Sequence, residues 1–118
     1  MEKYIIQKSQ KIVSALYLVT DLIKDSDAIK WEMREESISF ISSMTMLNTT
    51  LPIEKEHSLQ MIFSSAQKLT SFLNVAFTSS LISKMNSTII IHEIESLVEF
   101  IRKGNDGDRI SSPGGSTT

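Results

Sequence analysis

Residues 59–77, LQMIFSSAQKLTSFLNVAF, decide how this chain folds. Their apolar side chains recur every three or four residues, which is the period of a helix that buries one face. The stripe consists of Leu59, Ile62, Phe63, Ala66, Leu69, Leu73 and Phe77. Pro52 suits the first turn of a helix, where no amide proton is needed. We therefore predict a helix over about residues 52–79 that packs along one side against other helices.

Three further segments show the same periodicity, over about residues 3–24, 27–47 and 87–103. Their expected core positions are Ile5, Ile12, Val13, Leu16, Val19 and Ile23, then Ile29, Met33, Phe40, Met44 and Leu47, and finally Ile90, Ile91, Ile94, Leu97, Val98 and Ile101. Ser26 or Asp27 can cap the second helix, and Asn86 or Ser87 the fourth. The joining segments are short, which makes consecutive helices antiparallel neighbours. The sequence predicts an all-α protein, an antiparallel up-down-up-down four-helix bundle with a flexible C-terminal tail.

All four glycines follow Lys103. A β-rich domain needs glycines in its turns, so this distribution favours helices. Gly104 comes directly after Arg102 and Lys103, an arrangement typical of a helix C-terminus. We expect a four-helix bundle over residues 1–103. Residues 104–118 are expected to form a flexible Gly/Ser-rich tail or the start of a linker to a further domain.

The composition narrows the class of protein. The chain has 118 residues, which suits one domain, and it has no cysteine, which excludes disulfides and thiol chemistry. A net charge of −2 argues against a strongly basic nucleic-acid surface. The N-terminus lacks the pattern of a signal peptide, and the least charged stretch, residues 58–83, holds too many polar side chains for a membrane span. We expect a cytoplasmic protein without a membrane contact.

Glu54 and His57 have the Glu-x-x-His spacing by which some helical bundles hold iron or manganese. Such a bundle needs a second pair of this kind, but the residue three before the other histidine, His92, is Ile89. At about 100° per residue, His57 also points away from the Ala66 side of its helix. We therefore predict no metal site and no cofactor.

No catalytic arrangement emerges from the sequence. A Gly-rich phosphate loop is excluded because no glycine precedes Gly104. The segment HEIE, residues 92–95, lacks the second histidine of a zinc-protease motif, since Ser96 stands in its place. No serine lies on a predicted strand–turn–helix elbow. We assign no catalytic residue and expect that the protein is not an enzyme.

Trp31 is the residue that bears most on function. On its predicted helix it points away from the main apolar stripe, as Ile38 does, and Arg34 lies near both. On the first helix, Leu18 and Leu22 extend the apolar surface beyond the stripe. These side chains have two interpretations. They belong to a wider core, because a central helix in a small bundle can be apolar over much of its circumference. Alternatively, they form a contact surface, since Trp and Arg are over-represented at such surfaces. Both interpretations stay open for Trp31. The candidate interface comprises Trp31, Arg34, Ile38, Leu18 and Leu22.

Two parts of the chain resemble known helical families. Residues 12–35, IVSALYLVTDLIKDSDAIKWEMRE, and 79–86, SSLISKMN, resemble the helical N-terminal regions of uncharacterised proteins from small-genome candidate-phylum bacteria. Some of those continue into a Ser/Thr-rich linker and a helix-turn-helix domain, which implies an N-terminal module of a bacterial regulator. Residues 78–101 resemble the small four-helix bundle family encoded in bacterial ribosomal RNA insertions, whose members often form rings and can carry a basic surface.

We therefore expect a non-catalytic protein-interaction or self-association module, and the first resemblance implies that it is the N-terminal part of a bacterial regulator. Its expected partner is a second copy of the chain or another protein. The alternative is a nucleic-acid-associated four-helix bundle, which the net charge of −2 disfavours.

Overall fold

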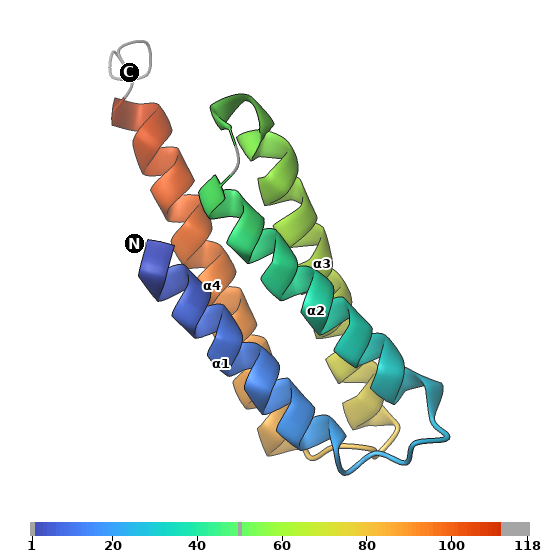
Figure 1. Cartoon of the computed structure of the whole chain (residues 1–118). Helices are drawn as coiled ribbons and strands as arrows, with labels where there is room; N and C mark the ends of the chain where they lie inside the picture. The colour runs from blue at the N-terminus through green and yellow to red at the C-terminus, as the bar shows by residue number, and fades with distance from the viewer. Residues whose placement is uncertain (1, 50, 112–118) are drawn as a thin grey trace.

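The chain forms four long antiparallel helices (Figure 1). The computed structural model describes residues 2–49 and 51–111. The helices are α1 (Glu2–Thr20), α2 (Ala28–Thr49), α3 (Lys55–Thr78) and α4 (Lys84–Ser111), and a short 3-10 helix, η1 (Pro52–Glu54), leads into α3. No strand occurs within the described ranges. The predicted all-α four-helix architecture is confirmed.

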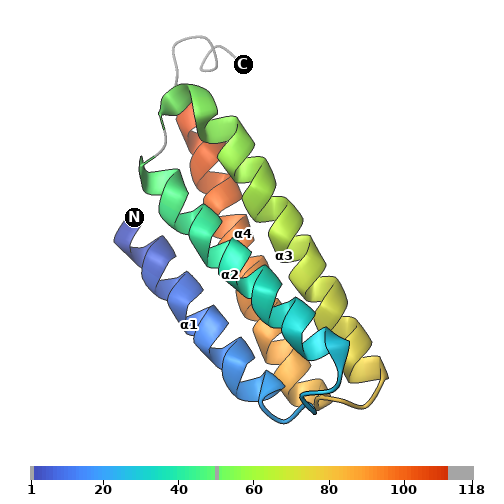
Figure 2. The same ribbon diagram turned by 45° about the vertical axis from the view of Figure 1, so that its right-hand side comes forward.

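Each helix packs against two of the other three, and all four run side by side along the bundle (Figure 2). α1 packs against α2 and α4, and α3 packs against the same two helices, so that α1 and α3 are diagonal to one another. Consecutive helices run in opposite directions, as expected for helices joined by short turns. The first and last helices are therefore antiparallel neighbours, and their surfaces form one continuous side of the bundle.

The core follows the predicted stripes. The largest fully buried side chains come from every helix: Leu16, Met33, Phe40, Met44, Ile62, Leu69, Leu73, Ile94 and Leu97. Phe63 is only partly buried, because it lies at the open groove between α3 and α4, where the Arg102 guanidinium covers its ring at 4.8 Å. Burial of these apolar faces is what holds marginally stable helices together in water.

Some helix ends differ in detail from the sequence expectation. α1 ends at Thr20, not near Lys24. The Asp27 side chain accepts a hydrogen bond of 3.2 Å from the amide of Ile29, so Asp27 caps α2 as expected for one of the two predicted residues. The cap predicted for α4 is wrong: α4 begins earlier, and the Ser83 hydroxyl oxygen accepts a bond of 3.1 Å from the amide of Asn86.

The turn between α3 and α4 is tight although it contains no glycine. The amide of Ser80 donates to the Phe77 carbonyl at 2.9 Å, and the amide of Leu81 donates to the Ala76 carbonyl at 2.8 Å. This pair of bonds is the Schellman arrangement, which requires a left-handed residue after the helix. Ser80 supplies it with φ 63°, a conformation that glycine adopts at lower cost.

The predicted end of the fourth helix at Lys103 is wrong. α4 continues through Gly104 to Ser111, so residues 104–111, which we assigned to the tail, are helical. Gly104 keeps a negative φ, and nothing lies within 4 Å of the place where a Cβ would be. A glycine permits a helix to end but does not require it. Residues 112–118 lie outside the described part of the chain.

Candidate interaction surface

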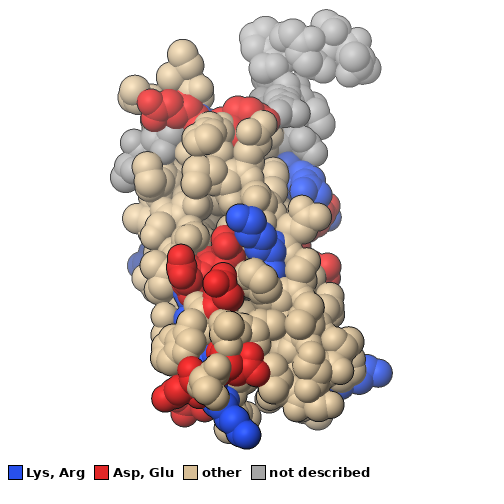
Figure 3. Space-filling view, turned by 90° about the vertical axis from the view of Figure 1, so that its right-hand side faces the viewer, with Lys and Arg blue, Asp and Glu red and all other residues tan. Residues whose placement is uncertain are grey.

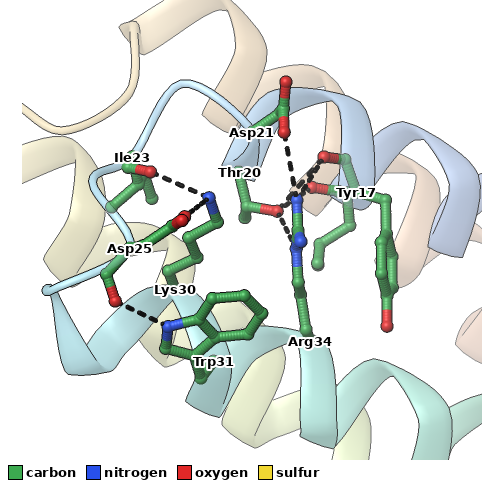
Figure 4. A network of polar contacts seen from close by, with 9 residues as sticks. Tyr17, Thr20, Asp21, Ile23, Asp25, Lys30, Trp31 and Arg34 are labelled. Carbon is green, nitrogen blue, oxygen red and sulfur yellow. Dashed lines mark hydrogen bonds and ion pairs between the residues drawn. The ribbon is translucent and has the colours of Figure 1, made fainter.

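The end of α1 is held by two cations from α2 (Figure 4). The first is Lys30, whose side chain is buried. Its Nζ donates to the Ile23 carbonyl at 3.0 Å and to Asp25 Oδ1 at 2.7 Å. The bond from Lys30 lowers the pKa of the exposed Asp25 carboxyl. A buried ammonium needs such partners, because an unpaired charge would be costly to remove from water. Lys30 thus closes the turn that connects α1 to α2.

The second cation is Arg34. Its Nε donates to Thr20 Oγ1 at 3.0 Å, and one terminal nitrogen donates to the Tyr17 carbonyl at 3.1 Å. The same terminal nitrogen lies 3.8 Å from the exposed Asp21 carboxylate. The guanidinium also covers the Tyr17 ring at 4.6 Å. A cation at a helix C-terminus offsets the negative end of the helix dipole. The Tyr17 carbonyl thus accepts from Arg34 in addition to the Asp21 amide.

Trp31 joins this network from its outer side. The indole Nε1 donates to the Asp25 carbonyl at 2.8 Å, and the ring lies 5.3 Å from Lys30 Nζ and 5.4 Å from the Arg34 guanidinium carbon. The side chain nevertheless stays 48% exposed. Trp31 and Arg34 are therefore close together and make contacts within the chain that stabilise the α1–α2 turn. Their role in an interface stays a prediction.

Leu18 and Leu22 are the predicted apolar residues of the first helix and the turn that follows it. Both are largely in water, with exposed fractions of 76% and 74%. In α4, Met85 is 71% exposed and Ile89 is 54% exposed. α1 ends where α4 begins (Figures 1 and 2), and Ala15 of α1 lines one groove with Ile89 of α4 and a second hollow with Leu18. We call the set Ala15, Leu18, Leu22, Met85 and Ile89 the α1–α4 apolar face.

An open groove links the two halves of this face. Its lining residues are Lys8, Lys11, Ile12, Ala15, Ile89, Ile90 and Glu93. Ala15 also lines the neighbouring hollow that contains Leu18. Lys8 and Glu93 form an ion pair of 2.8 Å across the groove, and their mutual hydrogen bond raises the pKa of Lys8 and lowers that of Glu93. The face is thus apolar at its centre and charged at its edge, which is the usual anatomy of a contact surface.

Sequence reasoning placed Leu18 and Leu22 in the candidate interface and left out Met85 and Ile89. The signal for Ile89 was its position off the main stripe of its helix. The helix start at Lys84 brings Met85 into the first turn of α4, one turn before Ile89. Ile38, the remaining predicted residue, is about half exposed on α2. The five predicted side chains therefore divide between the α1–α2 turn network, the outer side of α2 and the α1–α4 apolar face.

A polar groove lies between α2 and α3. The Ser65 hydroxyl donates to Glu36 Oε2 at 2.6 Å, and Lys68 Nζ is 4.0 Å from Glu36 Oε1. His57 lines the same groove but is exposed, as is Glu54 in η1. Figure 3 shows acidic and basic groups at several places along this side of the bundle, with uncharged surface between them. The hydrogen bond between Ser65 and Glu36 joins α3 to α2 and so helps to hold these two helices together.

Within residues 2–49 and 51–111, no helix is both long and apolar enough to cross a bilayer. The same residues contain no group of three or more His, Asp or Glu side chains that could hold a metal ion. No protein-family model, curated protein or solved structure matches the chain.

Proposed function

We propose that this chain is a non-catalytic protein-interaction module whose contact surface is the α1–α4 apolar face. The observation that carries the proposal is the gathering of Leu18, Leu22, Met85 and Ile89, all more than half exposed, at one end of the side formed by α1 and α4. Single exposed apolar residues are ordinary, whereas a cluster of large ones marks a binding surface.

The energetics favour a protein partner. Fully burying one large aliphatic side chain contributes about 1.5–3 kcal/mol, so four such side chains supply a useful driving force before ordering costs are subtracted. The groove between Ala15 and Ile89 is open at the surface and lined by aliphatic groups. An amphipathic helix fits such a groove by laying its apolar face along it.

The α1–α2 turn network supports this role. Lys30, Arg34 and Trp31 fix the end of α1, and Leu22 lies in the segment that they hold. A contact surface that is rigid before binding loses less conformational entropy when the partner arrives. A module of this kind would serve as the interacting part of a larger regulator, which the resemblance of residues 12–35 and 79–86 favours.

Photocrosslinking in cells tests the proposal. A benzophenone amino acid would be placed at Leu18, and in a matched control at Val75, an exposed apolar position on α3. Irradiation should yield a discrete covalent protein adduct from position 18 and much less from position 75. A second copy of the chain counts as a partner in this experiment. Equal yields from both positions, or no adduct from either, would contradict the proposal.

A further inference from the structure

The outer side of α1 carries a regular row of exposed residues. Gln7, Lys11, Ser14, Leu18 and Asp21 follow one another at intervals of four, three, four and three residues, and all five are exposed. This alternation places all five residues on one side of the helix. Asp21 continues the row beyond the end of α1, because its amide still donates to the Tyr17 carbonyl at 3.1 Å.

Charge is distributed unevenly along this row. From residue 3 to residue 20, α1 carries Lys3, Lys8 and Lys11 and no carboxylate. The turn that follows, residues 21–27, carries Asp21, Asp25 and Asp27 together with one cation, Lys24, and is acidic on balance. Two copies of such a helix repel each other when parallel, since like ends then meet. When antiparallel, the basic half of each copy lies over the acidic end of the other. The row is therefore electrostatically complementary to itself.

The positions along the row define one register for this pairing. Lys11 and Asp21 are each five residues from Leu16, and Ser14 and Leu18 are each two residues from it. A two-fold axis level with Leu16 therefore brings Lys11 of one copy to Asp21 of the other. The same axis places Leu18 over the small side chain of Ser14. An interface between identical copies must be self-complementary in this way.

α4 agrees with the same axis. The Lys8–Glu93 ion pair sets α1 and α4 side by side at those residues. Both helices rise equally per residue and run in opposite directions, so Leu16, eight residues after Lys8, is level with Met85, eight residues before Glu93. The axis therefore also brings Met85 of one copy over Met85 of the other.

From the register of these pairs, we propose that the α1–α4 apolar face binds a second copy of this chain in an antiparallel, isologous contact. This inference rests on the proposed function and names its partner. In the complex, Leu18 and Met85 lie at the centre of the contact, and the two symmetry-related Lys11–Asp21 pairs lie at its edges.

A charge-exchange experiment tests both the partner and the orientation. Lys11→Glu places carboxylates opposite Asp21 in both halves of the contact, and Asp21→Lys places ammonium groups opposite Lys11. Each variant alone should raise the dissociation constant of self-association by at least about tenfold. In an equimolar mixture, both pairs are again of opposite charge, and the dissociation constant should return to within about threefold of the wild-type value. Sedimentation equilibrium over a wide concentration range measures all four samples.

Two controls separate the contact from general effects. Lys103→Glu and Glu99→Lys make the same changes of net charge at exposed positions of α4 far from the proposed axis, and they should leave self-association unchanged. Circular dichroism checks that each variant keeps the helical fold. Asp21→Asn provides a milder substitution, because Asp21 lies 3.8 Å from Arg34. It should weaken association less than Asp21→Lys.

The outcomes distinguish this inference from the proposed function. A wild-type chain that stays monomeric at every concentration overturns the second-copy contact, whereas a crosslink from position 18 to a different protein would still support the proposed function. Wild-type association that is insensitive to Lys11→Glu places the contact elsewhere and overturns the inference. Variants that both dissociate, with no recovery in the mixture, exclude the antiparallel register.

Discussion

Arg34 of α2 donates to the carbonyl of Tyr17 in α1 at 3.1 Å, and its guanidinium lies 4.6 Å from the ring centroid of the same residue. One side chain thus binds both the backbone and the side chain of Tyr17. Because the two residues are seventeen positions apart in the chain, the contact joins two helices and determines how the first of them ends. Arg34 is the residue through which α2 closes the C-terminal end of α1.

Replacing Arg34 by alanine should lower the free energy of unfolding by about 2 kcal/mol, since hydrogen bonds from a charged donor contribute about 1.5–3 kcal/mol. Arg34→Lys should recover only part of the loss, because an ammonium cannot reach Thr20, the Tyr17 carbonyl and the ring together. Arg102→Ala is the matched control, as Arg102 also covers an aromatic ring, that of Phe63. Urea denaturation measures all three, and equal losses in Arg34→Ala and Arg102→Ala would contradict this account.

Trp31 should contribute mainly to the stability of the α1–α2 turn. Trp31→Phe keeps an aromatic ring but removes the Nε1 donor to Asp25, and it should cost about 1 kcal/mol. Trp31→Ala also removes the ring from Lys30 and Arg34 and should cost about 2 kcal/mol in total. Ile38→Ala, at a similarly exposed position on the same helix, is the control. Thermal melts measure stability, and sedimentation measures association. A Trp31→Ala variant that is fully stable but dissociated would place the contact surface on α2.

Leu73 tests the core. It is fully buried in α3, and Leu73→Ala should lower the free energy of unfolding by about 2–5 kcal/mol through lost burial and the cavity that remains. Val75→Ala, two residues away on the exposed side of α3, should change stability by less than about 0.5 kcal/mol. Denaturant titrations compare the two variants. Similar small effects at both positions would show that the stripe does not face a packed core.

Ser80 offers a stabilising substitution. Its φ of 63° is a left-handed conformation that costs a residue with a Cβ roughly 1 kcal/mol relative to glycine. Ser80→Gly should therefore raise the free energy of unfolding by up to about 1 kcal/mol. At Ser79, where φ is −90°, the same replacement should lower stability, because it only adds freedom to the unfolded chain. Thermal melts that show a loss at both positions would be inconsistent with the observed turn.

The Lys8–Glu93 pair predicts a pH dependence. The pKa of Glu93 is lowered from its ordinary value of 4.5 by the hydrogen bond from Lys8. The folded state therefore binds this proton less readily than the unfolded state, so the stabilisation is present above pH 4.5 and is lost as the pH falls through the folded pKa. The pKa of Lys8 is raised from 10.5. Its contribution is present below that pH and is lost as the pH rises through the folded pKa.

This effect should be small because both side chains are partly exposed, and such pairs contribute at most about 1 kcal/mol. The difference in unfolding free energy between wild type and Glu93→Gln should be constant from pH 6 to 9, a window of about three units that avoids both titrations. It should shrink toward zero in acid. Guanidinium is unsuitable as the denaturant, since it screens the pair, so urea is used at low salt. A difference that grows in acid would have the wrong sign.

Much of the fold was predictable from residues 59–77 and their counterparts in the other helices. The spacing of Leu59, Ile62, Leu69 and Leu73 was sufficient to assign α3 and its buried side, and the lack of glycine before Gly104 excluded a turn-rich sheet. Helix ends were harder to predict. Ser80 turns the chain where glycine is usual, and Gly104 lies within a helix, because packing around a turn can outweigh the preference of one residue.

The candidate site was predictable only in part. Leu18 and Leu22 were recognisable as apolar residues outside the stripe of their helix. That they gather near Met85 and Ile89 follows from the antiparallel contact of α1 with α4, which are separated by two other helices in sequence. The close contacts of Trp31 and Arg34 with Asp25 and Tyr17 likewise depend on how the α1–α2 turn closes.

The sequence by itself determined that the chain makes four helices and which side of each is buried, because helical periodicity is a local property that depends on residues three and four positions apart. The tertiary structure alone decided which exposed side chains share a surface. Leu18 and Ile89 lie seventy-one residues apart in the chain, and only the packing of the first helix against the last, which buries both stripes at once, brings them to the same side of the bundle.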